Sequence, residues 1–238
     1  FFLGIAGTVF AVGIPFSSAW YDASKKGFAT GVFGAGMVGT AISAFATPRL
    51  VQGIGYFQTH VLIAVICAVT AAISFFFLKD SPATIGREVT PLMPKIVQAF
   101  KVKTTWQLCF LYAVVFGAFV AFSNYLPTYL SNIYNANDAG MRAAGFAVAA
   151  VIARPFGGVL ADKFGPKIIT LISLGGVVIL AVITAFQPDA EHVYGAVFIL
   201  MAALLGLGHG SVFGWVARAA DPKNVGAVSG VVAAAGAL

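Results

Sequence analysis

Charged side chains are scarce in this sequence of 238 residues. Lys, Arg, Asp and Glu together make up 9% of the chain, whereas a soluble globular domain carries roughly 25%. Hydrophobic residues make up 60% of it, and the mean hydropathy is +0.94. A fold with so few charges cannot cover its surface with polar groups, which excludes an ordinary soluble domain. The medium around the folded chain is therefore expected to be largely lipid.

Cysteines and clustered metal ligands are scarce as well. The two cysteines, Cys67 and Cys109, stand inside or at the edge of apolar runs without the spacing of metal ligands. We expect them to be small apolar packing residues. No nucleophile stands with a base in a catalytic pattern, so neither an enzyme nor a bound metal or cofactor is expected. The net charge of +6 is spread over loops, so nucleic acid is not an expected partner.

Long apolar runs are what the sequence has in abundance. A bilayer core of about 30 Å needs about 20 helical residues, and helices satisfy their own backbone hydrogen bonds in lipid. Runs of this size lie at 1–20, 27–46, 60–78, 106–133, 143–161, 168–186 and 194–217, and another starts at 225. The pattern predicts an all-α polytopic membrane protein with seven full transmembrane helices and the start of an eighth. Because the chain starts and ends inside apolar runs and lacks a first Met, we expect an internal fragment of a longer protein.

Basic residues gather in every second loop. One set of loops holds Lys25, Lys26, Lys79, Arg87, Lys95, Lys101, Lys103, Lys163, Lys167, Arg218 and Lys223, and the loops between them hold Arg49 and Arg142. Loops rich in Lys and Arg stay on the cytoplasmic side of a membrane. Loops 22–26, 79–105, 162–167 and 218–224 are therefore predicted to be cytoplasmic, with the chain in the inner (plasma) membrane of a bacterium or archaeon.

The longest loop, 79–105, divides the chain into two parts. Residues 1–78 are expected to form the end of an N-terminal helix bundle, and residues 106–238 a C-terminal bundle. Within the loop, Ile96, Val97 and Phe100 are spaced as on one face of a helix, with lysines between them. This spacing fits a short helix lying on the inner membrane surface; a structureless linker is the alternative.

A short motif, GGVLADKFGPK, spans residues 157–167. Gly158, Asp162, Lys163, Gly165 and Lys167 fit the pattern G-x-x-x-D-[RK]-x-G-x-[RK]. Gly158 lets a neighbouring helix approach, and Asp162 can meet the N-terminal dipole of an adjacent helix or a basic partner. Gly165 makes a tight turn, and the two lysines anchor the loop at the inner face. A generic positively charged hairpin is the alternative, but the motif resembles the cytoplasmic loop motif of the major facilitator superfamily, which implies that fold, here incomplete.

Two apolar stretches are striped with glycine. GFATGVFGAGMVG contains Gly27, Gly31, Gly34, Gly36 and Gly39, and Gly206, Gly210 and Gly214 stand four residues apart further along. Such spacing lets helices pack closely, and bare backbone can also face a cavity. The first stretch resembles the fifth-span signature of the nitrate/nitrite porter family within the superfamily. GVVAAAGAL at the end of the chain looks like the start of the eleventh-span signature.

This resemblance implies that the fragment runs from about the fourth span to the start of the eleventh of twelve. It also implies site residues: Phe10 and Phe116 as apolar walls, Tyr112 as a hydroxyl donor, Arg154 as the anion-binding cation, and Gly34, Gly36 and Met37 along the anion path. The chain departs from the signature at Met37, where the family usually has asparagine. The departure leaves the substrate, nitrate or another, open.

Arg154 indicates an anion-binding site independently of the family resemblance. Arginine stays charged in proteins, and at mid-membrane it costs at least about 2.5 kcal/mol. It lies seven residues before Ala161, or about 10 Å from the inner end of its span at 1.5 Å per residue. All eight acids fall in loops or at span ends. An unpaired guanidinium facing a cavity suits a planar oxyanion; an arginine bonded to helix carbonyls, or to an acid outside this chain, is the alternative.

Further polar residues in apolar runs have two interpretations each. His209 can relay protons or can be a packed neutral histidine, and the second is favoured. Ser123 and Asn124 can line the outer vestibule or can hydrogen-bond between helices.

The expected function is secondary transport of a small inorganic anion, nitrate and/or nitrite, by alternating access of two helix bundles. A coupling proton or a counter-anion is a further expected partner, and the lack of a deep acid argues mildly against an internal carboxylate proton carrier. The alternatives are a drug or organic-anion porter of the same superfamily and, more remotely, a polytopic sensor or membrane enzyme without transport.

Overall fold

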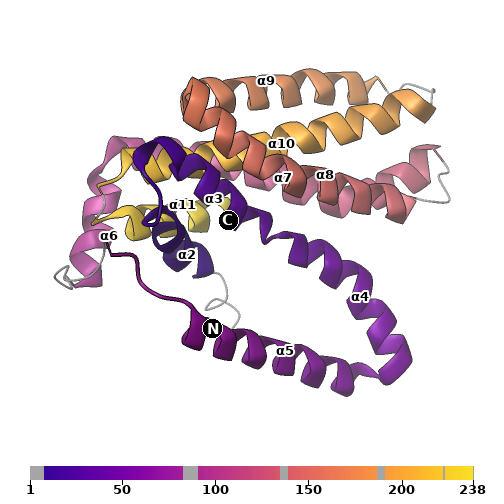
Figure 1. Cartoon of the computed structure of the whole chain (residues 1–238). Helices are drawn as coiled ribbons and strands as arrows, with labels where there is room; N and C mark the ends of the chain where they lie inside the picture. The colour runs from indigo at the N-terminus through magenta and orange to yellow at the C-terminus, as the bar shows by residue number, and fades with distance from the viewer. Residues whose placement is uncertain (1–7, 83–90, 135–138, 187–190, 222, 238) are drawn as a thin grey trace.

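The computed structural model describes residues 8–82, 91–134, 139–186, 191–221 and 223–237. Every regular element in these ranges is a helix (Figure 1). The helices are α2 (Val9–Ser18), the 3-10 helix η1 (Ala23–Lys25), α3 (Lys26–Ala35), α4 (Val38–Ile54), α5 (Tyr56–Phe77), α6 (Leu92–Lys101), α7 (Lys103–Tyr134), α8 (Ala139–Phe164), α9 (Pro166–Ala185), α10 (Glu191–Ala219) and α11 (Val225–Ala237). The prediction of an all-α fold is confirmed.

Five of these helices, α5 and α7 to α10, are long and apolar enough to cross a membrane. Seven full spans were expected, and the difference lies at the start of the chain. The described part of the first expected span is α2, which has 10 residues; residues 1–7 lie outside the described ranges. The second expected span, 27–46, is divided between α3 and α4.

The division between α3 and α4 falls at Gly36 and Met37, so the prediction of one unbroken span was wrong. The backbone N–H groups of Gly36, Met37 and Gly39 each donate to the carbonyl three residues earlier, at 3.1–3.2 Å. This tighter turn replaces α-helical bonding where glycines have lowered the stability of the helix. Beyond this turn α4 runs away from α2 and α3 toward α5 (Figure 1).

The loop expected between the runs 27–46 and 60–78 is mostly helical, which is a second correction. Pro48 lies inside α4, which continues to Ile54, and α5 begins at Tyr56. The chain turns at Gly55 alone, whose φ of 86° lies in the region that favours glycine. α5 packs chiefly against α4, and its most apolar stretch has no buried residue.

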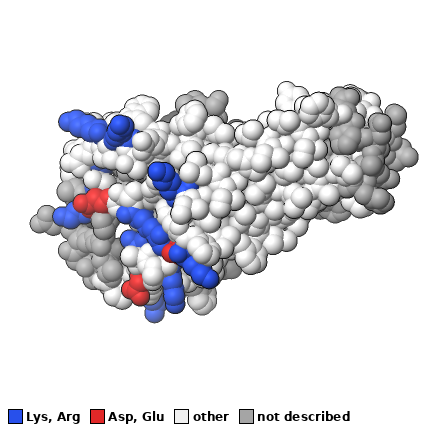
Figure 2. Space-filling view, turned by 90° about the horizontal axis from the view of Figure 1, so that it is seen from above, with Lys and Arg blue, Asp and Glu red and all other residues white. Residues whose placement is uncertain are grey.

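The 79–105 loop contains a short helix, α6, as predicted; its place on the inner membrane surface stays a prediction. Its Ala99 is buried, and Phe100 and Lys101 are exposed. The indole nitrogen of Trp106, at the start of α7, donates to the Phe100 carbonyl at 2.8 Å and ties the two helices together. Figure 2 shows the Lys, Arg, Asp and Glu side chains gathered at the end of the molecule where α6 lies, while the described residues over the long middle of this face are uncharged.

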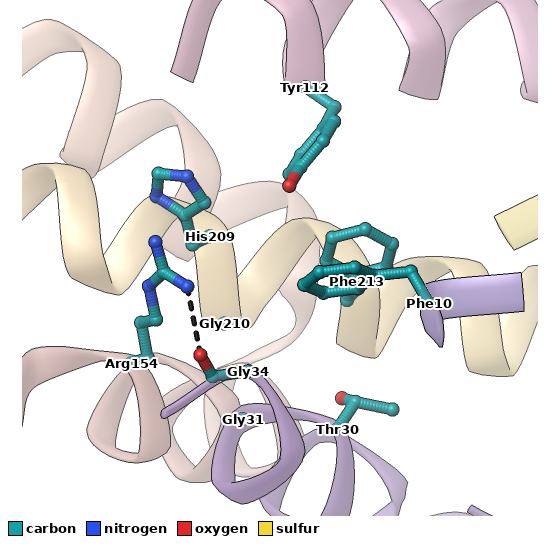
Figure 3. Close-up of a pocket in the computed structure, with 9 residues that line it drawn as sticks. All are labelled: Phe10, Thr30, Gly31, Gly34, Tyr112, Arg154, His209, Gly210 and Phe213. Atoms are coloured by element: carbon teal, nitrogen blue, oxygen red, sulfur yellow. Dashed lines mark hydrogen bonds between the residues drawn. The ribbon is translucent and has the colours of Figure 1, made fainter. Parts of the chain in front are cut away.

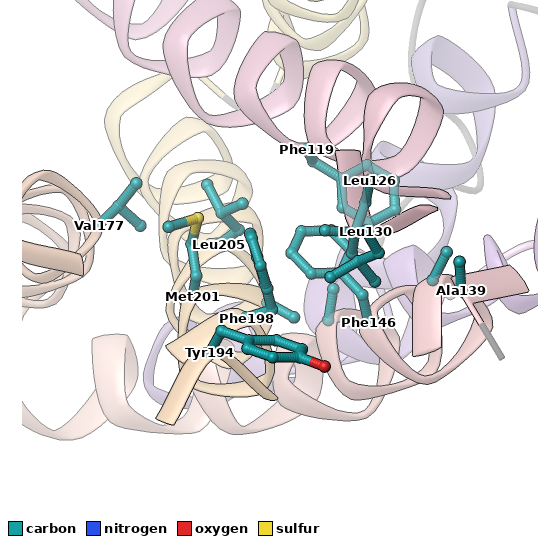
Figure 4. Packing of buried hydrophobic residues seen from close by; sticks show 13 residues of the cluster. Phe119, Leu126, Leu130, Ala139, Phe146, Val177, Tyr194, Phe198, Met201 and Leu205 are labelled. Carbon is teal, nitrogen blue, oxygen red and sulfur yellow. The ribbon is translucent and has the colours of Figure 1, made fainter. Parts of the chain in front are cut away.

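The helices from α7 onward pack around α10. Contacts are most extensive between α8 and α10, and α3 lies along both. One apolar cluster joins α7, α8 and α10 around Phe146, Met201 and Leu205 (Figure 4). A second cluster joins α2, α7, α10 and α11 around Ile14, Leu108 and Val232. The space between the two clusters, where α2, α3, α7, α8 and α10 meet, holds the buried polar side chains considered next.

Candidate functional site

A small pocket lies where these five helices meet (Figure 3). It has a cavity volume of about 10 Å³, which is room for about one water molecule. It is lined by Phe10, Thr30, Gly31, Gly34, Tyr112, Arg154, His209, Gly210 and Phe213. The structure thus brings together four residues that the sequence nominated from distant positions: Phe10, Gly34, Tyr112 and Arg154.

Arg154 is the charged group of the pocket. It is 1% exposed, and its Nη1 donates to the carbonyl oxygen of Gly34 at 2.8 Å. Its Nε and Nη2 are buried and have no hydrogen-bond partner. The guanidinium carbon stands 5.4 Å from the centre of the Phe119 ring, within reach of a cation–π contact. One carbonyl therefore meets part of the guanidinium, and two donor nitrogens stay unpaired.

No carboxylate pairs with Arg154 among the residues the structure describes. The ion pair found there joins Asp162 to Arg218, and Asp22, Asp80 and Asp221 lie at or between helix ends. Glu88, Asp138, Asp189 and the side chain of Glu191 fall outside what the structure describes. The buried cation thus lacks a counter-charge within the described chain, a state that burial in an apolar medium makes costly.

Glycines set the position of Arg154. A Cβ on Gly31 would lie 2.8 Å from the Arg154 carbonyl oxygen, and a Cβ on Gly210 would lie 2.7 Å from the backbone nitrogen of Gly158. Real Cβ atoms do not approach so closely, so α3 and α10 pack backbone to backbone against α8 only because these residues are glycine. Both expected uses of the glycine stripe are therefore present, since Gly31, Gly34 and Gly210 also line the pocket.

Aromatic rings enclose the other side of the pocket. The hydroxyl of Tyr112 points into it (Figure 3), and the Tyr112 ring stacks on Phe116 with a centroid distance of 5.4 Å. Phe10 stacks on Phe213 at 5.3 Å and meets Phe33 edge-on at 5.6 Å. The arrangement offers a flat apolar wall opposite a cation, with one hydroxyl between them.

A second polar cluster lies at the end of α8 and centres on Asp162. Its carboxylate accepts hydrogen bonds from the backbone N–H groups of Gly27 at 2.9 Å and Phe28 at 2.8 Å. Nη2 of Arg218 donates to the same carboxylate at 2.7 Å, and Nη1 of Arg218 donates to the Ala161 carbonyl at 3.2 Å. Asp162 thus meets both the N-terminal turn of α3 and a basic partner on α10.

The glycines of the same motif have the expected geometry. A Cβ on Gly158 would collide with the Gly27 carbonyl, so this glycine allows α3 to lie directly on α8. Gly165 has a φ of 91° and forms the single-residue turn between α8 and α9. Lys163 and Lys167 are exposed at this end. The tight turn and close approach predicted from the motif are confirmed.

Comparison with known families agrees with this geometry. The Major Facilitator Superfamily matches the chain over residues 1–238. The chain belongs to the major facilitator superfamily. This membership confirms the expected fold class and the expectation that the chain is not an enzyme.

Similar superfamily members carry transport names. The chain is 52% identical to the probable nitrate/nitrite transporter NarK2 of Mycobacterium tuberculosis, 34% identical to the nitrite extrusion protein of Bacillus subtilis, and 32% identical to the probable nitrate/nitrite antiporter NarK1 of Thermus thermophilus. Each similarity covers all of this chain and 60% of the relative. The chain therefore spans about 60% of the length of the curated relatives it matches.

Three nominated residues lie outside the lining of the pocket. Phe116 stacks on the ring of Tyr112 and does not line the pocket itself. Gly36 is exposed at the break between α3 and α4, and Met37 packs against the apolar cluster around Phe146 and Leu205. These three remain predictions about the anion path.

Sequence reasoning missed Thr30 and Phe213 as pocket residues. A signal for both was available, because Thr30 stands four residues before Gly34 and Phe213 four residues after His209. Residues four apart lie on the same face of a helix.

Proposed function

We propose that the protein containing this chain transports nitrate, nitrite or both by alternating access, and that Arg154 binds the anion. The observation that carries the proposal is the buried Arg154 guanidinium with Nε and Nη2 unpaired in a pocket. The relatives named as nitrate or nitrite transporters support the choice of anion.

The unpaired edge of Arg154 suits this substrate class. Nη1, which donates a hydrogen bond to the Gly34 carbonyl, lies on the same side of the guanidinium as Cδ. Nε and Nη2 therefore form the other edge of the planar group. Their N–H bonds run parallel and can donate to two oxygens of one oxyanion. Nitrate and nitrite are planar and have two oxygens at a suitable spacing. An anion on this edge supplies the missing counter-charge, and Tyr112 can donate a third hydrogen bond.

The size of the pocket favours a small anion over a drug or an organic anion. Sites for drug-sized ligands occupy about 300–1,000 Å³, whereas this cavity has room for about one water. Nitrate, with four heavy atoms, needs a modest widening by side-chain movement. A drug-sized molecule would require the helices to separate.

Alternating access has a physical basis in the Asp162 cluster. This carboxylate joins α3, from the 1–78 part, to α8 and α10, from the 106–238 part. Its bonds hold the two parts together at one end of the pocket, and that end opens when they break. At Gly31 and Gly158 the contact between α3 and α8 is backbone to backbone, so few side chains interlock there to resist sliding.

Orientation follows from the charges. The charged side chains gather at the end of the molecule that carries α6 (Figure 2), and the positive-inside rule favours the cytoplasm for that end. Loops 22–26, 79–105, 162–167 and 218–224 are then cytoplasmic, and Asp162 closes the cytoplasmic side of the pocket. A bacterial inner membrane is the proposed location, as the relatives are bacterial.

The test is anion flux into proteoliposomes made with the full-length protein. We expect nitrate and nitrite uptake in the wild type, loss of uptake in Arg154→Ala, and a fall of about tenfold or more in Arg154→Lys, because a point charge lacks the two parallel donors. Lys103→Ala, which removes an exposed basic residue at the start of α7, is the matched control. Wild-type uptake of bulky organic anions without nitrate uptake would refute the substrate assignment.

A further inference from the structure

His209 is a buried titratable group that the proposed function leaves unused. It lies on α10, is 3% exposed and lines the pocket with Arg154. Its Nδ1 lies 2.8 Å from the carbonyl oxygen of Leu205, and its Nε2 is buried without a hydrogen-bond partner. Figure 3 shows the His209 ring beside the Arg154 guanidinium.

The contact with Leu205 determines which nitrogen carries the hydrogen of the neutral ring. A carbonyl oxygen only accepts, so Nδ1 must be the donor. Nε2 of the neutral ring is then a lone pair without hydrogen. It cannot donate to an anion, and it gains an N–H only when the ring takes up a proton.

Three aromatic rings close off His209 from the side of α7. Tyr112, Phe116 and Phe119 lie 5.7, 5.9 and 5.6 Å from the imidazole centroid. None of these contacts supplies a hydrogen bond to Nε2. Phe119 also lies against the Arg154 guanidinium, so the two basic side chains share one wall of the pocket.

Few other charges face His209 from the helices packed against α10. Arg154 comes from α8, and Tyr112 comes from α7 with Cys109 one turn before it. Helices α2 and α11 contain no titratable side chain in their described lengths. Lys26 of α3 and Lys167 of α9 stand at the Asp162 end of their helices. In the described part of the chain, no carboxylate is placed to compensate a positive charge on the ring.

We propose that His209 takes up a proton together with the anion that Arg154 binds, and that its Nε2–H then becomes a further ligand of that anion. This inference rests on the proposed function. Without an anion, a protonated His209 faces the positive charge of Arg154. With an anion between them, both cations are attracted to it, and the lone pair that would repel its oxygens has become a donor. Anion binding and proton binding therefore favour each other, and by linkage the effect is reciprocal.

The consequence for transport is coupling. The complex that crosses the membrane contains one anion and one proton, and on release Nε2 returns its proton to water as the anion leaves. A transporter of this kind moves its anion with a proton rather than by exchange alone, without an internal carboxylate.

The test measures nitrate binding to the purified full-length protein between about pH 5.5 and 8, where histidine titrates. Nitrate remains ionised throughout, so its own chemistry adds no pH dependence. Wild-type affinity should rise as the pH falls, by up to about tenfold per pH unit. His209→Gln should bind more weakly at low pH and lose this dependence.

His60→Gln is the matched control for this variant. His60 on α5 makes the same contact, with its Nδ1 2.8 Å from the Tyr56 carbonyl, but it is exposed and lies outside the pocket. It should keep the wild-type pH profile.

A second measurement needs no variant. Nitrate added to wild-type protein in weak buffer should draw up to about one proton per bound nitrate from solution. Binding without proton uptake, or an unchanged pH profile in folded His209→Gln, overturns the role of His209 while leaving the proposed function intact. If wild-type protein binds no nitrate at any pH, or if Arg154→Ala binds it normally, the proposed function itself fails.

Discussion

Replacing Asp162 with alanine should open the pocket toward the α8 end that carries this residue. The carboxylate is the acceptor for two backbone N–H groups of α3 and for Arg218. Loss of an N-terminal cap costs about 1–2 kcal/mol, and loss of a partly exposed charged hydrogen bond costs about 1–2 kcal/mol. The closed arrangement should therefore lose about 2–4 kcal/mol, which moves an open–closed equilibrium about 30- to 700-fold toward the open state.

A cysteine at position 30 reports this opening. Thr30 is 2% exposed and lines the pocket, and Thr30→Cys is nearly isosteric. The background carries Cys67→Ala and Cys109→Ala and has any cysteine in the rest of the full-length protein replaced as well, so that the new thiol alone reacts. An impermeant maleimide applied from the α6 side should label Asp162→Ala at least about tenfold faster than the parent. Asp162→Asn should be intermediate, because it keeps one acceptor oxygen and loses the charge.

Asp221→Ala is the control for this experiment, because the Asp221 carboxylate is exposed and accepts from the backbone of Lys223 two residues away. It should label at the parental rate. If Asp162→Ala labels within twofold of the parent while the protein remains folded, the Asp162 cluster does not hold the two parts of the chain together, and the account of alternating access given above is wrong.

Three further predictions concern packing and selectivity. Gly158→Ala should force α3 away from α8 at a cost of about 1–3 kcal/mol and lower the melting temperature. Gly175→Ala, where a Cβ would meet nothing within 4 Å, should leave the melting temperature unchanged or raise it slightly, because alanine is favoured over glycine inside a helix; equal melting temperatures of the two variants would refute the close approach. Tyr112→Phe, which keeps the ring stack and removes the hydroxyl, should weaken nitrate binding by about three- to tenfold; unchanged affinity would exclude the hydroxyl as a ligand. Met37→Asn supplies the amide usual in the porter signature, and a nitrate-to-nitrite transport ratio equal to that of the wild type would remove Met37 from the anion path.

Arg154 and Asp162 were predictable because each is a charged residue type that is unusual at its position in an apolar helix. A lone guanidinium deep in an apolar helix is costly wherever the helix lies, and an acid followed by a glycine turn has few uses at a helix end. Composition alone predicted the helical membrane fold for the same reason, since lipid leaves few alternatives. These inferences depend on the medium and on residue chemistry, and not on how the helices pack.

What the sequence could not reveal depends on packing. The break at Gly36 and Met37 was missed because an apolar, glycine-rich run is compatible with one helix or two, and the contacts of α3 with α8 and α10 decide between them. The spacing puts Thr30 on one helix face with Gly34 and Phe213 on one face with His209, but only the rotation of each helix turns that face toward the pocket. The Leu205 contact of His209, which assigns the hydrogen of the neutral ring to Nδ1 and leaves Nε2 bare in the pocket, also depends on packing and could not be predicted from the sequence.

The central claim is that the unpaired edge of Arg154 binds the anion. Equilibrium binding of nitrate to full-length protein tests it most directly, with wild type, Arg154→Lys and Lys103→Ala compared at one pH near 6. Lys103→Ala should bind as the wild type does, and Arg154→Lys should bind at least about tenfold more weakly, because it loses one of the two parallel donors. Equal affinity in all three proteins would contradict the claim.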